Sequence, residues 1–119
     1  MTGERDLARL LAALHPELDA VEYGFETIKE APPLGNAFAL IREKEGVTLV
    51  RPGTGWARIA LRVHSSLEAV GLTARVAAVL AARGIAANVI AAAHHDYFFV
   101  PWDRREEALA ELKGLETGA

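Results

Sequence analysis

The residues His94, His95 and Asp96 form the only cluster of titratable side chains that hints at a metal site. Imidazole and carboxylate groups hold ions such as Zn²⁺ when several of them converge on one point. Neighbouring residues in a strand or turn point in opposite directions, so one site would gain at most one of these histidines. The chain has no cysteine and no Glu-x-x-His pair. We therefore expect no metal ion and no cofactor.

Motifs for catalysis are also missing. The sequence lacks the G-x-S-x-G elbow of many serine hydrolases, the P-loop and the dinucleotide-binding fingerprint. His64 follows a predicted strand and is expected to be a loop residue and not a catalytic base, and His15, before Pro16, has no partner in the sequence. Acid–base catalysis needs convergent titratable groups. We expect a binding protein and not an enzyme.

One helix start has the features of an anion site. Ser65 and Glu68 have the capping-box spacing, which predicts a helix beginning at that point, and Gly71 follows. Free N–H groups at a helix start, together with the helix dipole, attract a carboxylate, and glycine lets the backbone approach a ligand closely. The alternative is that Ser65 and Glu68 only cap the helix and that Gly71 only serves packing.

The elements around this helix follow from hydrophobic periodicity. Residues 56–63 alternate as a strand with one buried and one wet face, and the wet face includes Arg58. Apolar residues at helical spacing then run to Arg83, and Gly84 is placed for a left-handed cap. Residues 85–93 are expected to form a buried strand, residues 94–96 a turn, and residues 97–100 the returning strand.

The last segment predicts a helix that begins with a second capping box, Asp103 with Glu106. Its buried stripe is Ala108, Leu109, Leu112 and Leu115. The element order from residue 56 onward is therefore β-α-β-β-α.

The first 55 residues predict a short helix and three strands. Asp6 is placed to cap the helix, which ends before Pro16. Residues 21–26 alternate as a strand, and the segments AFALIREK and VTLVR form a hairpin that turns at Glu45-Gly46. Pro32-Pro33 mark a loop between these strands.

The charge and the apolar stretches of the chain argue against nucleic acid and membranes as partners. The 119 residues carry 13 basic and 16 acidic side chains, a net charge of -3, which argues against nucleic acid. The apolar stretch from Val76 to Ala93 is broken by Arg83, Gly84 and Asn88, so we expect no membrane-spanning helix. The N-terminus does not resemble a secretory signal, and we expect a cytoplasmic protein.

The run VGLTARVAAVLAARGIAANVI, residues 70–90, resembles the signature stretch of ACT domains. The phrases RVHSSLEAVGL and DYFFVP resemble one subgroup, small stand-alone proteins of two tandem ACT-like halves, which is similar to the ACT modules of arginine sensors. The resemblance implies an α+β, ferredoxin-like antiparallel sheet with helices on one face. Residues 1–55 would be a degenerate ACT-like half and residues 56–119 an ACT-like domain, together one compact unit.

The resemblance also implies a function, that of a regulatory or sensor domain that binds a small molecule such as an amino acid. The usual loop proline is replaced here by Val70. Glu68 or Asp96 would supply the negative charge for an ammonium group of the ligand. The alternative for Asp96 is that it only forms the turn of the hairpin. Asn88 would contact either the ligand or a neighbouring backbone group. The expected anion-binding stretch comprises Ser65, Ser66, Val70, Gly71, Leu72 and Thr73.

The resemblance leaves a second function open, an ACT-like dimerisation protein that has lost its ligand. Open sheet edges pair readily, and the alanine-rich segment 86–93 permits this. In either case we expect a homodimer.

Overall fold

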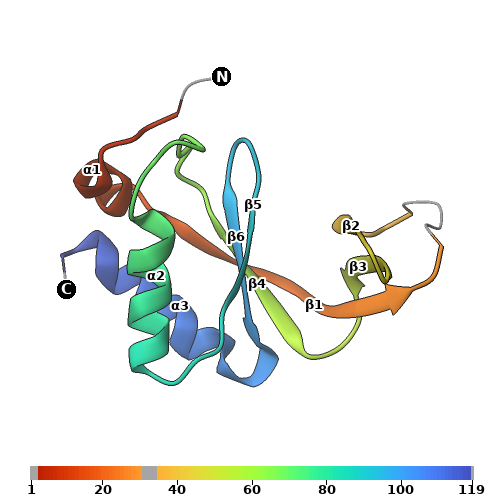
Figure 1. Ribbon diagram of the computed structural model, residues 1–119. Helices are drawn as coiled ribbons and strands as arrows, with labels where there is room; N and C mark the ends of the chain where they lie inside the picture. Colours follow the sequence, from red (N-terminus) through yellow and green to blue (C-terminus); the bar gives the residue numbers. More distant parts are fainter. Residues whose placement is uncertain (1–2, 31–34, 119) are drawn as a thin grey trace.

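The computed structural model describes residues 3–30 and 35–118, and in this part of the chain it has an α+β fold (Figure 1). The predicted loop at Pro32-Pro33 lies outside the described residues. The helices are α1 (Leu7–Ala12), α2 (Leu72–Ala82) and α3 (Arg105–Glu116), with a 3-10 turn η1 (Trp102–Arg104) before α3. The strands are β1 (Pro16–Ile28), β2 (Ala39–Glu43), β3 (Gly46–Pro52), β4 (Trp56–Leu61), β5 (Asn88–Ala91) and β6 (Asp96–Pro101).

The strands form one antiparallel sheet in the order β2-β3-β1-β4-β6-β5. From β4 onward the order is strand, helix, strand, strand, helix, as the sequence predicts. β4 pairs with β6 on one side and with β1 on the other. β1 thus takes the place beside β4 that the last strand takes in a ferredoxin-like unit. The predicted ferredoxin-like fold is confirmed.

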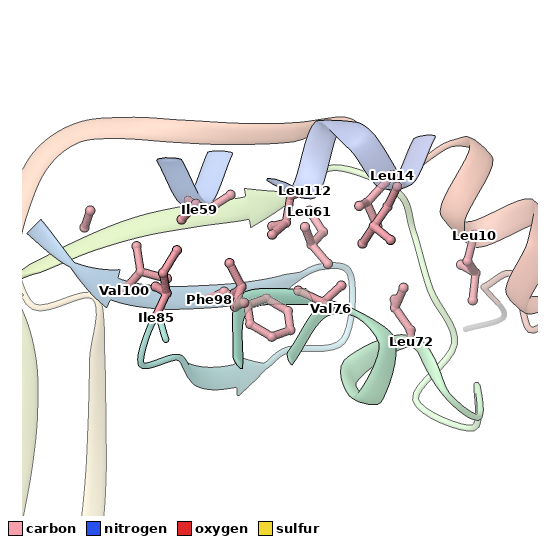
Figure 2. Close-up of a cluster of buried hydrophobic side chains, with 14 residues drawn as sticks. Leu10, Leu14, Ile59, Leu61, Leu72, Val76, Ile85, Phe98, Val100 and Leu112 are labelled. Carbon is pink, nitrogen blue, oxygen red and sulfur yellow. The ribbon is translucent and has the colours of Figure 1, made fainter. Parts of the chain in front are cut away.

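The three helices cover one face of the sheet and bury the larger core (Figures 1 and 2). Val76 and Leu80 of α2 and Leu112 of α3 are fully buried, so the helical stripes predicted from their spacing are confirmed. These side chains meet Ile59, Leu61, Phe98 and Val100 of the sheet, together with Leu10 and Leu14 from the α1 segment. The predicted N-cap of α1 is also present, since the Asp6 side chain accepts a hydrogen bond from the Arg9 N–H.

Gly84 ends α2 as predicted, in the left-handed region at φ 68°. The Gly84 N–H donates to the Ala81 carbonyl at 2.9 Å, and the Ile85 N–H donates to the Leu80 carbonyl at 3.0 Å. This pair of bonds is the Schellman motif, which satisfies carbonyls that the helix end would leave free.

The other face of β4 is not wet, contrary to the prediction. It carries a second core in which Tyr23, Val50 and Phe99 are buried and Phe38 and Tyr97 are partly buried; Ala39, Trp56 and Ile90 also pack there. The register of β1 against β4 shifts between Leu18 and Glu22, an irregularity of the kind that bends strands and increases their twist. Half of these residues come from the first 55 positions, and periodicity within β4 could not reveal cover from so far away in the sequence.

Arg58 shows how this second core holds a charge. Its guanidinium carbon lies 4.6 Å from the centre of the Phe38 ring and 5.1 Å and 5.5 Å from those of Tyr23 and Tyr97. Its NH2 group forms an ion pair with the Asp19 carboxylate, and about a fifth of each side chain is exposed. Cation–π contacts and an ion pair therefore keep the arginine in a largely apolar setting.

Three local predictions were wrong. The two capping boxes do not start their helices: α2 begins at Leu72 behind Gly71, and α3 begins at Arg105 after η1, without a side-chain cap. The segment 85–93 yields only β5, which is mostly exposed because it lies at the sheet edge with one neighbouring strand. Asp96 is not a turn residue but the buried first residue of β6.

Candidate ligand-binding site

A hollow of about 140 Å³ lies where the loop before α2 meets the β5–β6 hairpin. Figure 1 shows this loop and this hairpin at the same end of the sheet, near the N-terminal segment. The structure brings six of the predicted site residues to the hollow: Ser65, Ser66, Gly71, Leu72, Thr73 and Asp96. The rest of the lining comprises Leu67, Ala69, Ala74 and Ala91, which the sequence did not single out.

The loop before α2 is held by the N-terminal segment. The Glu4 N–H donates to the His64 carbonyl, and the Ser66 N–H donates to the Glu4 carbonyl, both at 2.9 Å. Gly3 lies so close to the loop that a Cβ atom there would be 2.6 Å from the Ser66 nitrogen. A side chain at Gly3 would displace the loop, and no sequence pattern pointed to this support.

Asp96 is the buried charge of the site. It is 8% exposed, and its Oδ2 accepts a hydrogen bond of 3.3 Å from the hydroxyl of Ser65, itself 6% exposed. Burial raises the pKa of the Asp96 carboxyl, and this effect is opposed by the Ser65 hydrogen bond and by His95. Within residues 3–30 and 35–118, neither lysine nor arginine forms an ion pair with Asp96. A buried carboxylate without a cation is costly, so a cationic group entering the hollow would gain by meeting it.

The start of α2 provides the opposite charge preference. Gly71 is in the left-handed region at φ 97°, and its carbonyl accepts the first helical hydrogen bond, from Arg75, at 2.9 Å. The N–H groups of Leu72, Thr73 and Ala74 precede that bond, and such groups have no partner inside a helix. They carry the positive end of the helix dipole, so this wall of the hollow favours an anion.

Gly71 is required for this turn. Its φ of 97° is strained for any residue with a side chain, and a Cβ atom there would lie 3.3 Å from the Leu7 side chain. The glycine therefore sets the direction in which α2 leaves the loop, and α1 packs against it.

Three predicted site residues lie away from the hollow. Glu68 is exposed, and its carboxylate is 3.7 Å from the Arg5 guanidinium. Val70 is 83% exposed, so its side chain faces solvent. Asn88 pairs with Phe99, which belongs to the second core, so Asn88 points to the opposite face of the sheet. The Ser65 hydroxyl, predicted to cap a helix, instead donates to Asp96.

Histidines lie at the rim of the same region. The His64 and His94 rings stack with centres 5.3 Å apart, so they link the loop to the hairpin beside the Ser65–Asp96 bond. Burial lowers the pKa of His95, and the nearby charges of Arg62, His94 and His64 lower it further. Among the described residues, no group of three His, Asp or Glu side chains is arranged to hold a metal ion.

Comparison with known proteins gives two family matches in tandem. One ACT domain model matches residues 2–55 and a second matches residues 55–113. No curated protein matches the chain. In the described part of the chain, no helix is long and apolar enough to cross a membrane.

Solved structures also match this chain, among them the following two. One is a Vibrio cholerae protein of unknown function, described as a possible transport protein, with 40% sequence identity and a TM-score of 0.82. The match covers 92% of this chain and 95% of that one. The other, from Agrobacterium tumefaciens, has 20% identity and a TM-score of 0.66 over 81% of this chain and 84% of that one. ACT domains are typically regulatory domains for small ligands and not catalysts, and this chain belongs to the ACT domain family.

Proposed function

We propose that the chain binds a small zwitterion, most simply an amino acid, in the hollow between the start of α2 and Asp96. The observation that carries this proposal is the pairing of opposite charge preferences across one small space. Leu72, Thr73 and Ala74, whose N–H groups have no partner within the helix, line the hollow together with the buried Asp96. An amino acid has a carboxylate and an ammonium group on one carbon, which suits such a pair of charge preferences.

In this proposal the ligand carboxylate accepts hydrogen bonds from the N–H groups of Leu72, Thr73 and Ala74. The ligand ammonium donates to Asp96, whose Oδ2 already accepts a hydrogen bond from Ser65. Hydrogen bonds with an ionised partner are about twice as strong as neutral ones. The ammonium would also stabilise the ionised form of Asp96, which burial disfavours.

The proposed role is regulatory, because a ligand acts on a partner by favouring one conformation or assembly over another. The loop that lines the hollow contacts both the N-terminal segment and β6. A ligand that orders this loop would therefore affect the conformation of both parts of the chain. Residues 1–55 serve as the degenerate half and residues 56–119 as the ligand-binding half of one unit. A transporter is one candidate partner, since the Vibrio cholerae relative is described as a possible transport protein.

We include a homodimer in the proposal. β5 lies at the edge of the sheet, with Val89 40% exposed, and an open edge can pair with a second copy. A cytoplasmic site of action is also part of it and fits a chain without cysteine.

The test is thermal denaturation and isothermal titration calorimetry with each of the twenty amino acids. A ligand at a hundred times its Kd should stabilise the fold by about 2.7 kcal/mol, a rise in Tm of several degrees. Asp96→Asn should abolish this rise, whereas Asp103→Asn, which changes an exposed carboxylate outside the hollow, should preserve it. A flat response across all twenty would contradict the proposal.

The open edge of β5 also favours the second candidate function, a dimerisation protein without a ligand. Sedimentation with and without amino acids separates the two functions. A dimer of constant stability and mass at every amino acid concentration would support the second.

A further inference from the structure

Apart from Asp96 and the start of α2, the hollow is lined largely by residues with small side chains. They include Ala69, Ala74 and Ala91, and Gly71 also lines the hollow. Ala91 pairs with Asp96 across the β5–β6 hairpin, so its methyl group is on the same face of the sheet as the carboxylate. Ala74 is in the first turn of α2, beside the helix N–H groups. The alanines therefore stand next to the groups that would hold the two ends of an amino acid.

The volume of the hollow supports the same conclusion. It measures about 140 Å³, whereas pockets for drug-sized ligands are about 300–1,000 Å³. A cavity of about 150 Å³ holds a molecule the size of benzene, and alanine and serine are of about that size. The hollow is partly open to solvent, so a leucine, phenylalanine or arginine side chain would extend beyond it and leave part of its surface without contact.

The charges of the hollow argue separately against a long cationic side chain. If Asp96 holds the ammonium group, a guanidinium would need a second carboxylate. Glu68 is the other acid of the loop, and it lies outside the hollow with its carboxylate 3.7 Å from Arg5. The hydroxyl-bearing residues Ser66 and Thr73 do line the hollow, and a ligand hydroxyl can hydrogen-bond to such groups.

We propose that this site selects amino acids with very small side chains, namely alanine, serine and glycine, and rejects arginine and the large apolar residues. The inference rests on the proposed function, since it names the ligand class of the same site. Ala74 and Ala91 are the specificity-determining residues because they line the hollow, and a larger side chain at either position would occupy the space beside the bound charges.

The test is calorimetry on the full chain with alanine, serine, glycine, leucine, phenylalanine and arginine. One methylene in a pocket changes selectivity by about 10–200-fold. We therefore expect the best small amino acid to bind at least about tenfold more tightly than leucine or arginine. Equal or tighter binding of leucine or arginine would overturn the size selection and leave the proposed function intact. Absence of binding by all six and by the remaining amino acids would overturn the proposed function, and this inference with it.

Substitutions at Ala91 and Ala74 test whether these residues determine the selection for small side chains. Ala91→Leu should weaken binding of the small amino acid by at least about tenfold, because it fills the hollow. Ala92→Leu places the same side chain at the next exposed residue, which does not line the hollow, and should leave the affinity within about twofold. Ala74→Leu repeats the test on α2, in case Ala91→Leu disturbs the hairpin, with circular dichroism to confirm folding. Unchanged affinity in both Ala74→Leu and Ala91→Leu would overturn the assignment.

Discussion

The two faces of the sheet each hold a largely buried aspartate, and the two differ in what they meet. Asp19 faces Arg58, whose guanidinium lies among three aromatic rings, so the charge of Asp19 is matched within the chain. Asp96 accepts a hydrogen bond from the Ser65 hydroxyl, has His95 nearby and lines a hollow, and no lysine or arginine of the described residues forms an ion pair with it. The charge of Asp19 is thus paired within the chain, although the Nε of Arg58 is buried without a hydrogen-bond partner in the part of the chain that the structure describes, whereas Asp96 has space beside it for a cation. An unmatched buried charge beside a hollow is thus a better sign of a ligand site than burial alone.

The largest expected effect comes from breaking the matched pair. Arg58→Ala would leave Asp19 without its cation and remove the arginine from among the rings. Loss of one partner of a buried ion pair costs about 3–5 kcal/mol, and we expect about 2–4 kcal/mol here since a fifth of the side chain is exposed. Urea denaturation would measure it. Arg51→Ala, which breaks the more exposed pair with Glu26, should cost about 0–1 kcal/mol. Equal effects of the two variants would contradict the comparison.

Asp96→Asn should increase the free energy of unfolding at neutral pH, whereas Arg58→Ala should decrease it. Because burial raises the folded-state pKa of Asp96, the folded chain binds this proton more tightly than the unfolded chain. The wild type therefore loses stability as pH rises from the ordinary aspartate pKa, about 3.9, through the raised folded value. Asparagine does not titrate, so the variant should gain on the wild type across this window and keep the advantage at neutral pH. Urea denaturation from pH 3.5 to 8 would show it, and a variant less stable than the wild type at pH 7 would argue against an unmatched charge.

Two left-handed glycines sharpen the distinction between fold and site. Gly71 at φ 97° and Gly84 at φ 68° both resist a side chain, so alanine at either should cost about 1–2 kcal/mol in unfolding free energy. Only Gly71 lines the hollow. Gly71→Ala should also weaken amino acid binding, whereas Gly84→Ala should leave it unchanged once the protein is folded. The same loss of affinity in both variants would mean that Gly71 acts through stability alone.

The smallest expected effect is at Glu68. Its carboxylate is exposed and faces Arg5 outside the hollow. Glu68→Gln should change amino acid affinity by less than about twofold, since exposed pairs contribute little. A tenfold loss by calorimetry would show that the ligand ammonium meets Glu68 and not Asp96.

Local patterns predicted a large part of the fold. The positions of Val76 and Leu80 marked the buried stripe of α2, and Gly84 marked its end, because both depend on neighbours within one or two turns. The strands from Trp56 and from Tyr97 followed from alternation in the same way. The capping box at Ser65 failed although its spacing was right, because the Ser65 hydroxyl donates to Asp96, 31 residues away. The box at Asp103 failed because Asp103 lies within the 3-10 turn before α3.

Long-range pairing was the part that could not be read from the sequence. The sequence predicted the loop and proposed an anion-binding stretch in it, with Asp96 as a counter-charge. The burial of Asp96 could not be predicted, because it depends on where β6 pairs with β4. Alternation within residues 56–63 placed Arg58 on a solvent-exposed face. That prediction was wrong because Asp19 and the aromatic rings that cover Arg58 come from distant segments. The alanines that bound the hollow carry no chemistry of their own, so no motif pointed to them.

The most direct test of the central claim is an amide NMR titration of the ¹⁵N-labelled chain with L-alanine. The proposed contacts predict saturable shifts concentrated at the N–H groups of Leu72, Thr73 and Ala74 and at Asp96. The amides of β2 and β3 should remain unchanged. Saturable shifts that avoid the start of α2, or spectra that do not respond to any amino acid, would contradict a zwitterion site between α2 and Asp96.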